Sequence, residues 1–227
     1  RGGFTAYLGD GTGRNWKEIE NSGLPAPGRE EEGDVEGTGW CNDMHLVDMN
    51  GDGRLDVVSG YYTGPRVWRG DGKGHFESYS TGLTRSRLGG VYRKTAIGDI
   101  NGDGRPDLAV ANVVNGVEAY LQSADGTWTG PIDVMPELKG GATAVALGDM
   151  DGDGKLDAVI GGQLARRGEG KGHGLYVRVG DGKGGFADAP GTNLPQEGLE
   201  IVWGIALVNI ERDRRPDIVI ASGGDFG

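Results

Sequence analysis

A nine-residue segment in which acidic and small residues alternate occurs three times in this chain, each time before a short β-branched run. Its first copy, DMNGDGRLD, covers residues 48–56. The other two, DINGDGRPD and DMDGDGKLD, cover 99–107 and 149–157. A plain turn between strands also favours Asp, Asn and Gly. Turn chemistry does not require an acid at the ninth position of every copy, so we interpret these segments as cation-binding loops.

Oxygen ligands at alternate positions suit a hard cation. Ca²⁺ takes about 6 to 8 oxygens from carboxylates, amides, backbone carbonyls and water. The two glycines of each loop allow the backbone angles that curl the chain around an ion. We therefore expect three calcium ions, which stabilise the fold without taking part in chemistry. The expected ligands are Asp48, Asn50, Asp52, Arg54 (backbone carbonyl) and Asp56; Asp99, Asn101, Asp103, Arg105 (carbonyl) and Asp107; and Asp149, Asp151, Asp153, Lys155 (carbonyl) and Asp157.

These loops differ from the helix-flanked calcium loop, which has a bidentate Glu at position twelve. Here Ser59, Val110 and Ile160 occupy that position. The runs after the loops, such as LDVVSG and LDAVIGG, are rich in β-branched residues and are typical of strands. Each loop is therefore predicted to join two β-strands.

The loops recur with a period of roughly 50 residues, which is typical of repeat architectures. A second signal has the same period: a strand, a Gly-rich turn and an aromatic residue, which together predict a β-hairpin. This signal occurs in VWRGDGKGHF (67–76), AYLQSADGTW (119–128) and YVRVGDGKGGF (176–186). Each repeat then contains four strands, and we predict one propeller blade per repeat.

With this spacing, the loops resemble those of the FG-GAP or VCBS repeat proteins, whose propeller blades carry a D-x-[DN]-x-D-G-x-x-D calcium loop, as in the integrin head. The resemblance covers nearly the whole chain. It implies an all-β fold, a β-propeller, and bound calcium. It does not fix the function, because the family includes adhesion modules, lectins and domains attached to enzymes.

The chain is predicted to form one propeller domain over residues 1–227, most simply with four blades. Its first residues read as the second half of a blade, and its last residues as a first half. We predict that the halves join into a closing blade, which would leave no open sheet edge. The alternative is a fragment of a longer propeller with two open half-blades. The predicted blades are 201–227 plus 1–25, 39–83, 90–138 and 141–195, and residues 26–38 form an insert.

The segment from Asn209 to Asp217 is a degenerate fourth loop. Arg212 and Arg214 stand where the other loops have glycine. A β-carbon there disfavours the backbone angles that wrap an ion. We expect no calcium in this loop, and we expect an arginine to pair with one of its acids instead. The alternative is a surface turn whose charges all face water.

The amino-acid composition limits the partners that the protein can bind and the cellular compartment in which it works. A formal net charge of −11 without a basic stripe argues against a nucleic-acid partner. No run approaches the ~18 apolar residues of a membrane span. The lone Cys41 excludes an internal disulfide and argues weakly against an oxidising compartment. Short all-oxygen loops usually need the millimolar calcium found outside cells, so we expect a secreted or cell-surface location.

Loops at the end of the sheets opposite the calcium loops differ between repeats, and we expect a ligand there. Flat aromatic rings can stack on a ligand while polar groups orient it. In a purely structural alternative, the tryptophans fill a narrow channel and Asp43 forms a salt bridge with Arg93 or Lys94. The candidate ligand-binding residues are Trp40, Asn42, Asp43, Tyr61, Tyr62, Tyr92, Arg93, Lys94 and Trp203.

Two classes of function remain open at this point. The first is an extracellular, calcium-stabilised module that binds carbohydrate or a protein surface. The second is a polysaccharide lyase or another carbohydrate-active enzyme on the same propeller. A pocket that joins one Arg, one Tyr and one His would favour the enzyme, whereas a shallow aromatic shelf would favour the lectin. The lyase candidates are Tyr61, Tyr62, His45 and Arg93.

Overall fold

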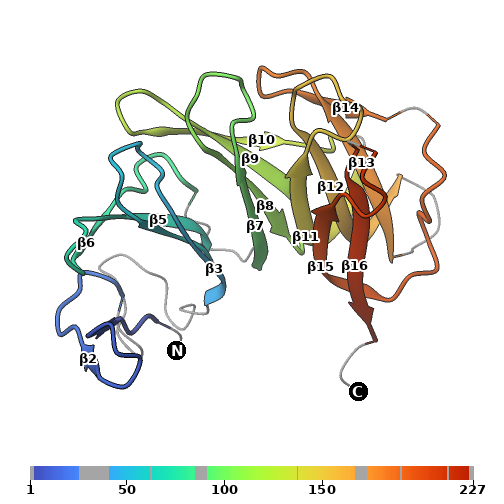
Figure 1. Cartoon of the computed structure of the whole chain (residues 1–227). Helices are drawn as coiled ribbons and strands as arrows, with labels where there is room; N and C mark the ends of the chain where they lie inside the picture. Colours follow the sequence, from blue (N-terminus) through green and yellow to red (C-terminus); the bar gives the residue numbers. More distant parts are fainter. Residues whose placement is uncertain are drawn as a thin grey trace.

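A computed structural model of the chain describes residues 3–25, 41–61, 63–84, 91–136, 138–166, 173–189, 191–213 and 215–224. Within these ranges the secondary structure consists of β-strands without a helix (Figure 1). The strands are β1 (Tyr7–Gly9), β2 (Trp16–Glu18), β3 (Cys41–Val47), β4 (Asp56–Tyr61), β5 (Gly64–Gly70), β6 (Phe76–Ser78), β7 (Tyr92–Gly98), β8 (Asp107–Asn112), β9 (Gly116–Gln122), β10 (Trp128–Asp133), β11 (Leu138–Gly148), β12 (Asp157–Arg166), β13 (His173–Gly180), β14 (Phe186–Asp188), β15 (Ile201–Val208) and β16 (Asp217–Gly223).

Three antiparallel meanders of four strands each form the body of the molecule. Their strand orders are β3-β4-β5-β6, β7-β8-β9-β10 and β11-β12-β13-β14. Each meander has the strand order of a propeller blade, so the predicted all-β propeller architecture is confirmed at the level of its blades. Two further sheets have two strands each, β1-β2 and β15-β16. We call them the N-terminal and the C-terminal half-blade.

The loops between the first and second strands have the backbone that their glycines predict. Gly51 and Gly53 have φ angles of +74° and +81°, and the glycines of the second and third loops lie in the same region. Only glycine adopts these angles without a steric penalty. The local sequence therefore determines the shape of all three loops.

Buried apolar side chains lie between neighbouring sheets. Val58 and Val67 of the first four-stranded sheet pack with Leu108 and Tyr120 of the second. A second cluster joins the β7–β10 sheet to the β11–β14 sheet, and a third joins the latter to the C-terminal half-blade. The second strands β4 and β8 are buried along their whole length. Face-to-face stacking of blades thus provides the core.

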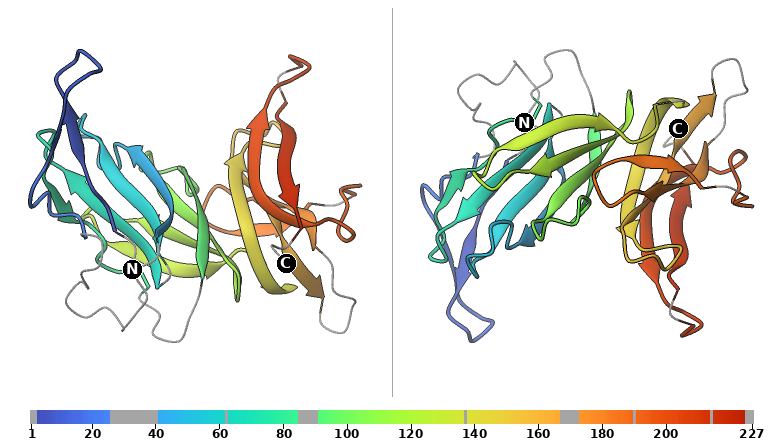
Figure 2. Two further views of the ribbon diagram at one scale, coloured as in Figure 1. Left: turned by 90° about the horizontal axis from the view of Figure 1, so that it is seen from below. Right: turned by 90° about the horizontal axis from the view of Figure 1, so that it is seen from above.

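The closing blade predicted from the two ends of the chain is not formed. The two half-blades are separate sheets, and they lie at opposite ends of an arc of blades (Figures 1 and 2). Packing between sheets sets the rotation from one blade to the next. In this arc the accumulated rotation does not bring the ends together. Within the described residues, neither half-blade pairs with a third strand.

Several sequence predictions fall outside the described residues. These are the proposed insert at 26–38 and the candidate ligand residues Trp40 and Tyr62. The inner strand of the third full blade begins at Leu138, slightly earlier than the predicted blade boundary at residue 141. None of the described segments is a helix long and apolar enough to cross a membrane.

Candidate metal loops and ligand face

The first loop turns its oxygen atoms towards its own backbone. Asp48 accepts hydrogen bonds from the N–H groups of Gly51 at 2.8 Å and Gly53 at 2.7 Å. The Gly53 bond is the main reason why the pKa of Asp48 lies below its usual value, and the other loop N–H groups add to it. Asn50 accepts from the Asp52 N–H at 3.0 Å. The carboxylate of Asp48 is thus held ionised at the centre of the loop.

The third loop brings three carboxylates together. Asp149, Asp151 and Asp153 each offer an oxygen, and these oxygens lie within 4.8 Å of one another. The first two loops have an asparagine, Asn50 or Asn101, at the middle position. An amide oxygen is also a suitable calcium ligand. The donor atoms and the loop backbone therefore fit a hard cation at the predicted positions.

The cationic residue at position seven folds back onto the acid at position five. Lys155 Nζ lies 2.7 Å from Asp153, and Arg105 pairs with Asp103. The Lys155 hydrogen bond is the main cause of the lowered pKa of Asp153. These exposed pairs offset part of the negative charge of the loops.

The acid at position nine has a structural role that the sequence alone did not reveal. Asp56 is fully buried, and its carboxylate accepts from the N–H groups of Met49 and Gly70, both at 2.8 Å. Asp107 and Asp157 make the corresponding pairs of bonds. Each carboxylate therefore ties a loop to the third strand of its blade. Burial raises the pKa of all three acids, to about 6 for Asp107. Metal ligation by these three acids stays a prediction.

The fourth loop keeps the shape of the others at a steric cost. Arg212 has a φ of +61°, in the region where the other loops have glycine. Asp217 accepts from the Ile210 N–H at 2.7 Å, and Asp213 from the Arg215 N–H at 2.9 Å. Among the described residues of this loop no arginine forms an ion pair with an acid. Arg214 lies outside the described part of the chain.

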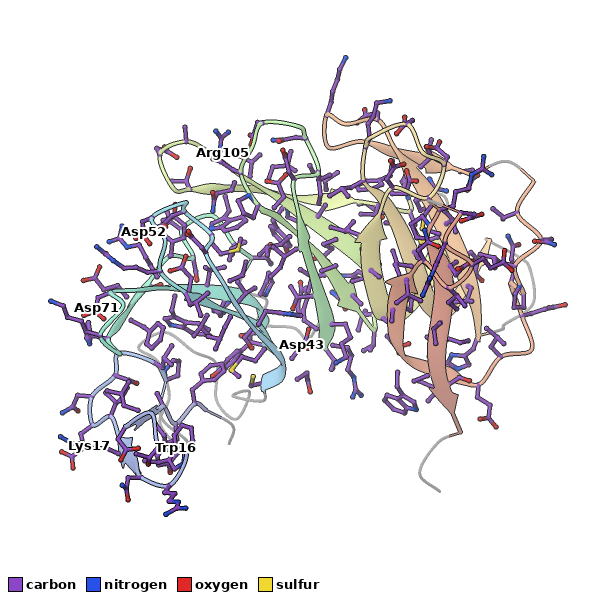
Figure 3. The ribbon with its side chains drawn as sticks, viewed as in Figure 1. Trp16, Lys17, Asp43, Asp52, Asp71 and Arg105 are labelled. Carbon is purple, nitrogen blue, oxygen red and sulfur yellow. The ribbon has the colours of Figure 1, made fainter. Side chains whose placement is uncertain are left out.

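At the opposite end of the sheets, Asp43 connects two blades (Figure 3). Its carboxylate accepts from the Thr95 N–H at 2.8 Å, contacts His45 Nε2 at 2.9 Å and pairs with Lys94 Nζ at 3.3 Å. Burial alone would raise the pKa of Asp43, but the bonds to His45 and Thr95 and the nearby positive charges lower it to about 2. The hydrogen bond to Asp43 raises the pKa of His45 despite partial burial. The ion pair with Lys94 is the one that the structural alternative predicts.

Two further candidates form a separate contact. The guanidinium of Arg93 on β7 lies 5.9 Å from the ring centroid of Trp203 on β15. Asn42 donates to the backbone oxygen of Tyr92 at 2.9 Å. The strands β7 and β15 belong to blades on either side of β11. The Arg93–Trp203 contact therefore reaches across the inner strand of the blade between them.

The two described tyrosines of the predicted ligand face are in the core, which corrects that expectation. Tyr61 is 3 % exposed, and its ring centroid lies 6.0 Å from those of Phe4 and Trp68. Tyr92 is 1 % exposed and donates its hydroxyl hydrogen to Glu118 at 2.9 Å. Sheets packed on both sides cover these rings, so neither is free to stack on a ligand.

A pocket that the sequence analysis missed lies beside the loop between β8 and β9. Its volume is about 350 Å³. The buried carboxylate of Glu118 accepts from Tyr92 at 2.9 Å, Tyr120 at 2.8 Å and Asn112 at 3.2 Å. Glu118 was not among the predicted site residues, because no sequence motif marks the hollow that opens beside it. The lining residues are Val114, Asn115, Glu118, Pro131, Asp133 and Gly140.

The central part of the chain matches a known repeat family. The FG-GAP-like repeat matches residues 48–110 and 99–160. The chain carries two FG-GAP-like repeats. Each begins at the first Asp of one loop and ends in the strand that follows the next loop. The FG-GAP-like repeats thus contain the three predicted calcium loops.

A solved structure with a similar fold is that of a lectin from Agrocybe aegerita, described as recognising non-reducing terminal N-acetylglucosamine. The TM-score is 0.56 at 17 % identity, and the alignment covers 94 % of this chain and 54 % of the lectin. This chain therefore spans about half the length of that lectin, and the likeness shows a shared fold. No curated protein matches the chain.

Proposed function

We propose that the protein is a carbohydrate-binding propeller module, secreted or displayed at the cell surface and stabilised by three calcium ions. Its FG-GAP-like repeats and the lectin fold that it resembles support a binding propeller. The observation that carries the finer proposal is the pocket beside the β8–β9 loop, which opens at the end of the sheets away from the calcium loops.

The chemistry of this pocket suits a sugar. Asn115 and Asp133 offer polar atoms that can bind hydroxyl or amide groups. Val114 and Pro131 offer apolar surface for the C–H face of a pyranose ring. Two carboxylates in the lining, those of Glu118 and Asp133, disfavour an acidic sugar by like-charge repulsion. We therefore propose a neutral sugar as the ligand.

The buried carboxylate of Glu118 gives the pocket a rigid floor. Four neighbours hold it: the hydroxyls of Tyr92 and Tyr120 and the amides of Asn112 and Asn115. Preorganised polar groups bind a ligand with a smaller loss of entropy than mobile ones. The role of Tyr92 is thus to support the pocket from below.

The lyase alternative has less support. Its described candidates have separate neighbours: His45 contacts Asp43, Tyr61 packs in an aromatic cluster, and Arg93 lies against Trp203. A lyase needs the base at the carbon that loses its proton and the charge-neutralising group at the carboxylate of the same sugar unit. Binding is therefore the preferred function.

A glycan array tests this proposal, with N-acetylglucosamine-terminated glycans among its neutral sugars and with calcium present. Asn115→Ala removes an exposed polar group from the pocket and should weaken binding about 10-fold, as expected for one lost hydrogen bond. Asn15→Ala, on the distant β1–β2 turn, is the matched control and should bind like the parent. Absence of binding by the parent, or unchanged binding by Asn115→Ala, would contradict the proposal.

A further inference from the structure

The side chain of Gln122 links two neighbouring blades. Gln122 is the last residue of β9, and it is 2 % exposed. Its amide nitrogen Nε2 donates to the backbone oxygen of Met49 at 3.0 Å. Met49 is the second residue of the first loop, in the preceding blade. A buried side chain of the second full blade is therefore bonded directly to the backbone of the first loop.

The second loop holds the backbone of the same residue. The N–H of Gln122 donates to the carboxylate of Asp107 at 2.8 Å, and its backbone oxygen accepts from Nε of Arg105 at 3.1 Å. Arg105 also pairs with Asp103. Figure 3 shows Arg105 at the same end of the sheets as Asp52 of the first loop. Gln122 thus has its backbone tied to the second loop and its side chain tied to the first.

The bond from Gln122 restrains the part of the first loop that joins two predicted ligands. Met49 lies between Asp48 and Asn50 in the sequence. Its N–H donates to Asp56 at 2.8 Å, and its side chain is buried. With its carbonyl bound to Gln122, both backbone groups of Met49 have a partner. Fixing a segment before a ligand binds lowers the entropy lost on binding, so this restraint favours an ion in the first loop.

The corresponding position of the third full blade cannot form this link. Its last third-strand residue is Gly180, whose N–H donates to Asp157 as that of Gln122 does to its own loop. Glycine has no side chain to reach Ile100, the second residue of the second loop. A β-carbon at Gly180 would lie 2.1 Å from the backbone oxygen of Leu156, so a larger residue does not fit there. The side-chain link from this position therefore joins the first loop to the second but not the second to the third.

We propose that Gln122 couples the first two loops, so that a calcium ion in the second loop raises the calcium affinity of the first. Ordering of the second loop fixes Arg105 and Asp107, which hold the backbone of Gln122, and the amide of Gln122 then fixes Met49. Because such coupling is reciprocal, an ion in the first loop raises the affinity of the second by the same factor. This coupling rests on the calcium binding in the proposed function and does not depend on the carbohydrate pocket.

The sign of the coupling separates the Gln122 link from simple electrostatics. Two divalent ions in neighbouring loops repel each other, so electrostatics alone would lower the affinity of one loop when the other is filled. Salt screens interactions between exposed charges and has much less effect on buried groups. A gain in affinity at roughly physiological salt is therefore the mark of the Gln122 link.

Calcium titration followed by nuclear magnetic resonance measures each loop separately. The amide of Gly51 reports the first loop, and that of Gly102 reports the second. Asp99→Ala removes the first ligand of the second loop and should lower the calcium affinity of the first loop about 10-fold, within the usual range for coupled sites. Asp149→Ala removes the corresponding ligand of the third loop. It is the matched control and should leave the affinity of the first loop unchanged.

A double-mutant cycle assigns the coupling to Gln122. Gln122→Met keeps the length of the side chain but cannot donate to Met49, and it should lower the calcium affinity of the first loop by a similar factor. Adding Asp99→Ala to Gln122→Met should cause no further loss, because the link is already broken. Gln122→Asn keeps the amide but is one methylene shorter, and it replaces Gln122→Met if that variant does not fold.

Three results would overturn the coupling while the loops still bind calcium and the proposed function stands. Equal affinity of the first loop with and without the second would show that the loops are independent. Lower affinity when the second loop is filled would show that ion repulsion dominates. A Gln122→Met variant that loses stability in EDTA but keeps both affinities would show a purely structural bond. A parent that binds no calcium would remove both this coupling and the calcium sites of the proposed function.

Discussion

The carboxylate of Asp107 accepts the backbone N–H of Gln122 at 2.8 Å, and its other oxygen accepts that of Ile100 at 2.9 Å. One buried side chain thus fixes the loop of the second full blade to the third strand of the same blade. The same pair of bonds recurs at Asp56 and Asp157. These three acids thus tie the loops to the third strands of their blades through backbone hydrogen bonds.

Replacing Asp107 with alanine should lower the free energy of unfolding by about 3 kcal/mol, because two buried N–H groups would lose their acceptor. Chemical denaturation in EDTA measures this loss without a contribution from metal. Asp103→Ala, in the same loop but exposed, is the control and should change stability little under these conditions. Equal effects of the two substitutions would show that the buried bonds do not stabilise the blade.

Calcium should raise the melting temperature, with three ions bound per chain. An ion that binds only the folded state adds about 2.7 kcal/mol per site at a hundredfold excess over its dissociation constant. Calorimetric titration gives the number of ions, and melting curves with EDTA and with calcium give the stabilisation. Identical melting curves would contradict the calcium interpretation, and a fourth ion would contradict the degeneracy of the Asn209–Asp217 loop.

Arg212→Gly should stabilise the protein by about 1 kcal/mol, because a side chain at a φ of +61° is disfavoured and glycine is not. Denaturation of the parent and the variant measures the difference. Arg215→Gly is the control. It removes the same charge from the same loop, and the added freedom of the unfolded chain should leave that variant no more stable than the parent. A gain of equal size in both variants would point to relief of charge repulsion instead.

The imidazole of His45 should titrate above its ordinary pKa of 6.5, because it is hydrogen-bonded to the carboxylate of Asp43. The stabilisation linked to the raised pKa of His45 is complete below pH 6.5 and is lost as the pH rises through the folded-state value. The stabilisation linked to the lowered pKa of Asp43 is complete above pH 3.8 and is lost as the pH falls towards about 2. Both stabilising contributions are therefore fully present between pH 3.8 and pH 6.5.

Nuclear magnetic resonance can follow the His45 ring directly. In Asp43→Asn the pKa of His45 should fall back towards or below 6.5, since burial then acts without the carboxylate. His75, which lies in a hairpin of the first full blade, serves as the internal reference. An unchanged His45 titration in Asp43→Asn would show that the contact does not control this proton.

Local features were predictable from the sequence because they depend on residues close together in the chain. The positive φ of Gly51 and Gly53 follows from a loop that must curl within nine residues. The antiparallel pairing of β5 with β6 follows from the hairpin signal at 67–76. The ion pair between Asp43 and Lys94 is one of the two that the structural alternative named, and both residues lie near the start of inner strands in neighbouring blades.

The sequence by itself thus determined the strands, the loops and the repeated blade, because spacing and glycine placement act locally. Only the tertiary structure decided which faces of those blades are covered. It buried Tyr61 and Tyr92, which a pattern of aromatic residues could not distinguish from surface residues. It also opened a pocket beside Glu118 and kept the two half-blades apart. These features depend on the rotation from sheet to sheet, which is set by packing across whole blades and is not encoded in any short segment.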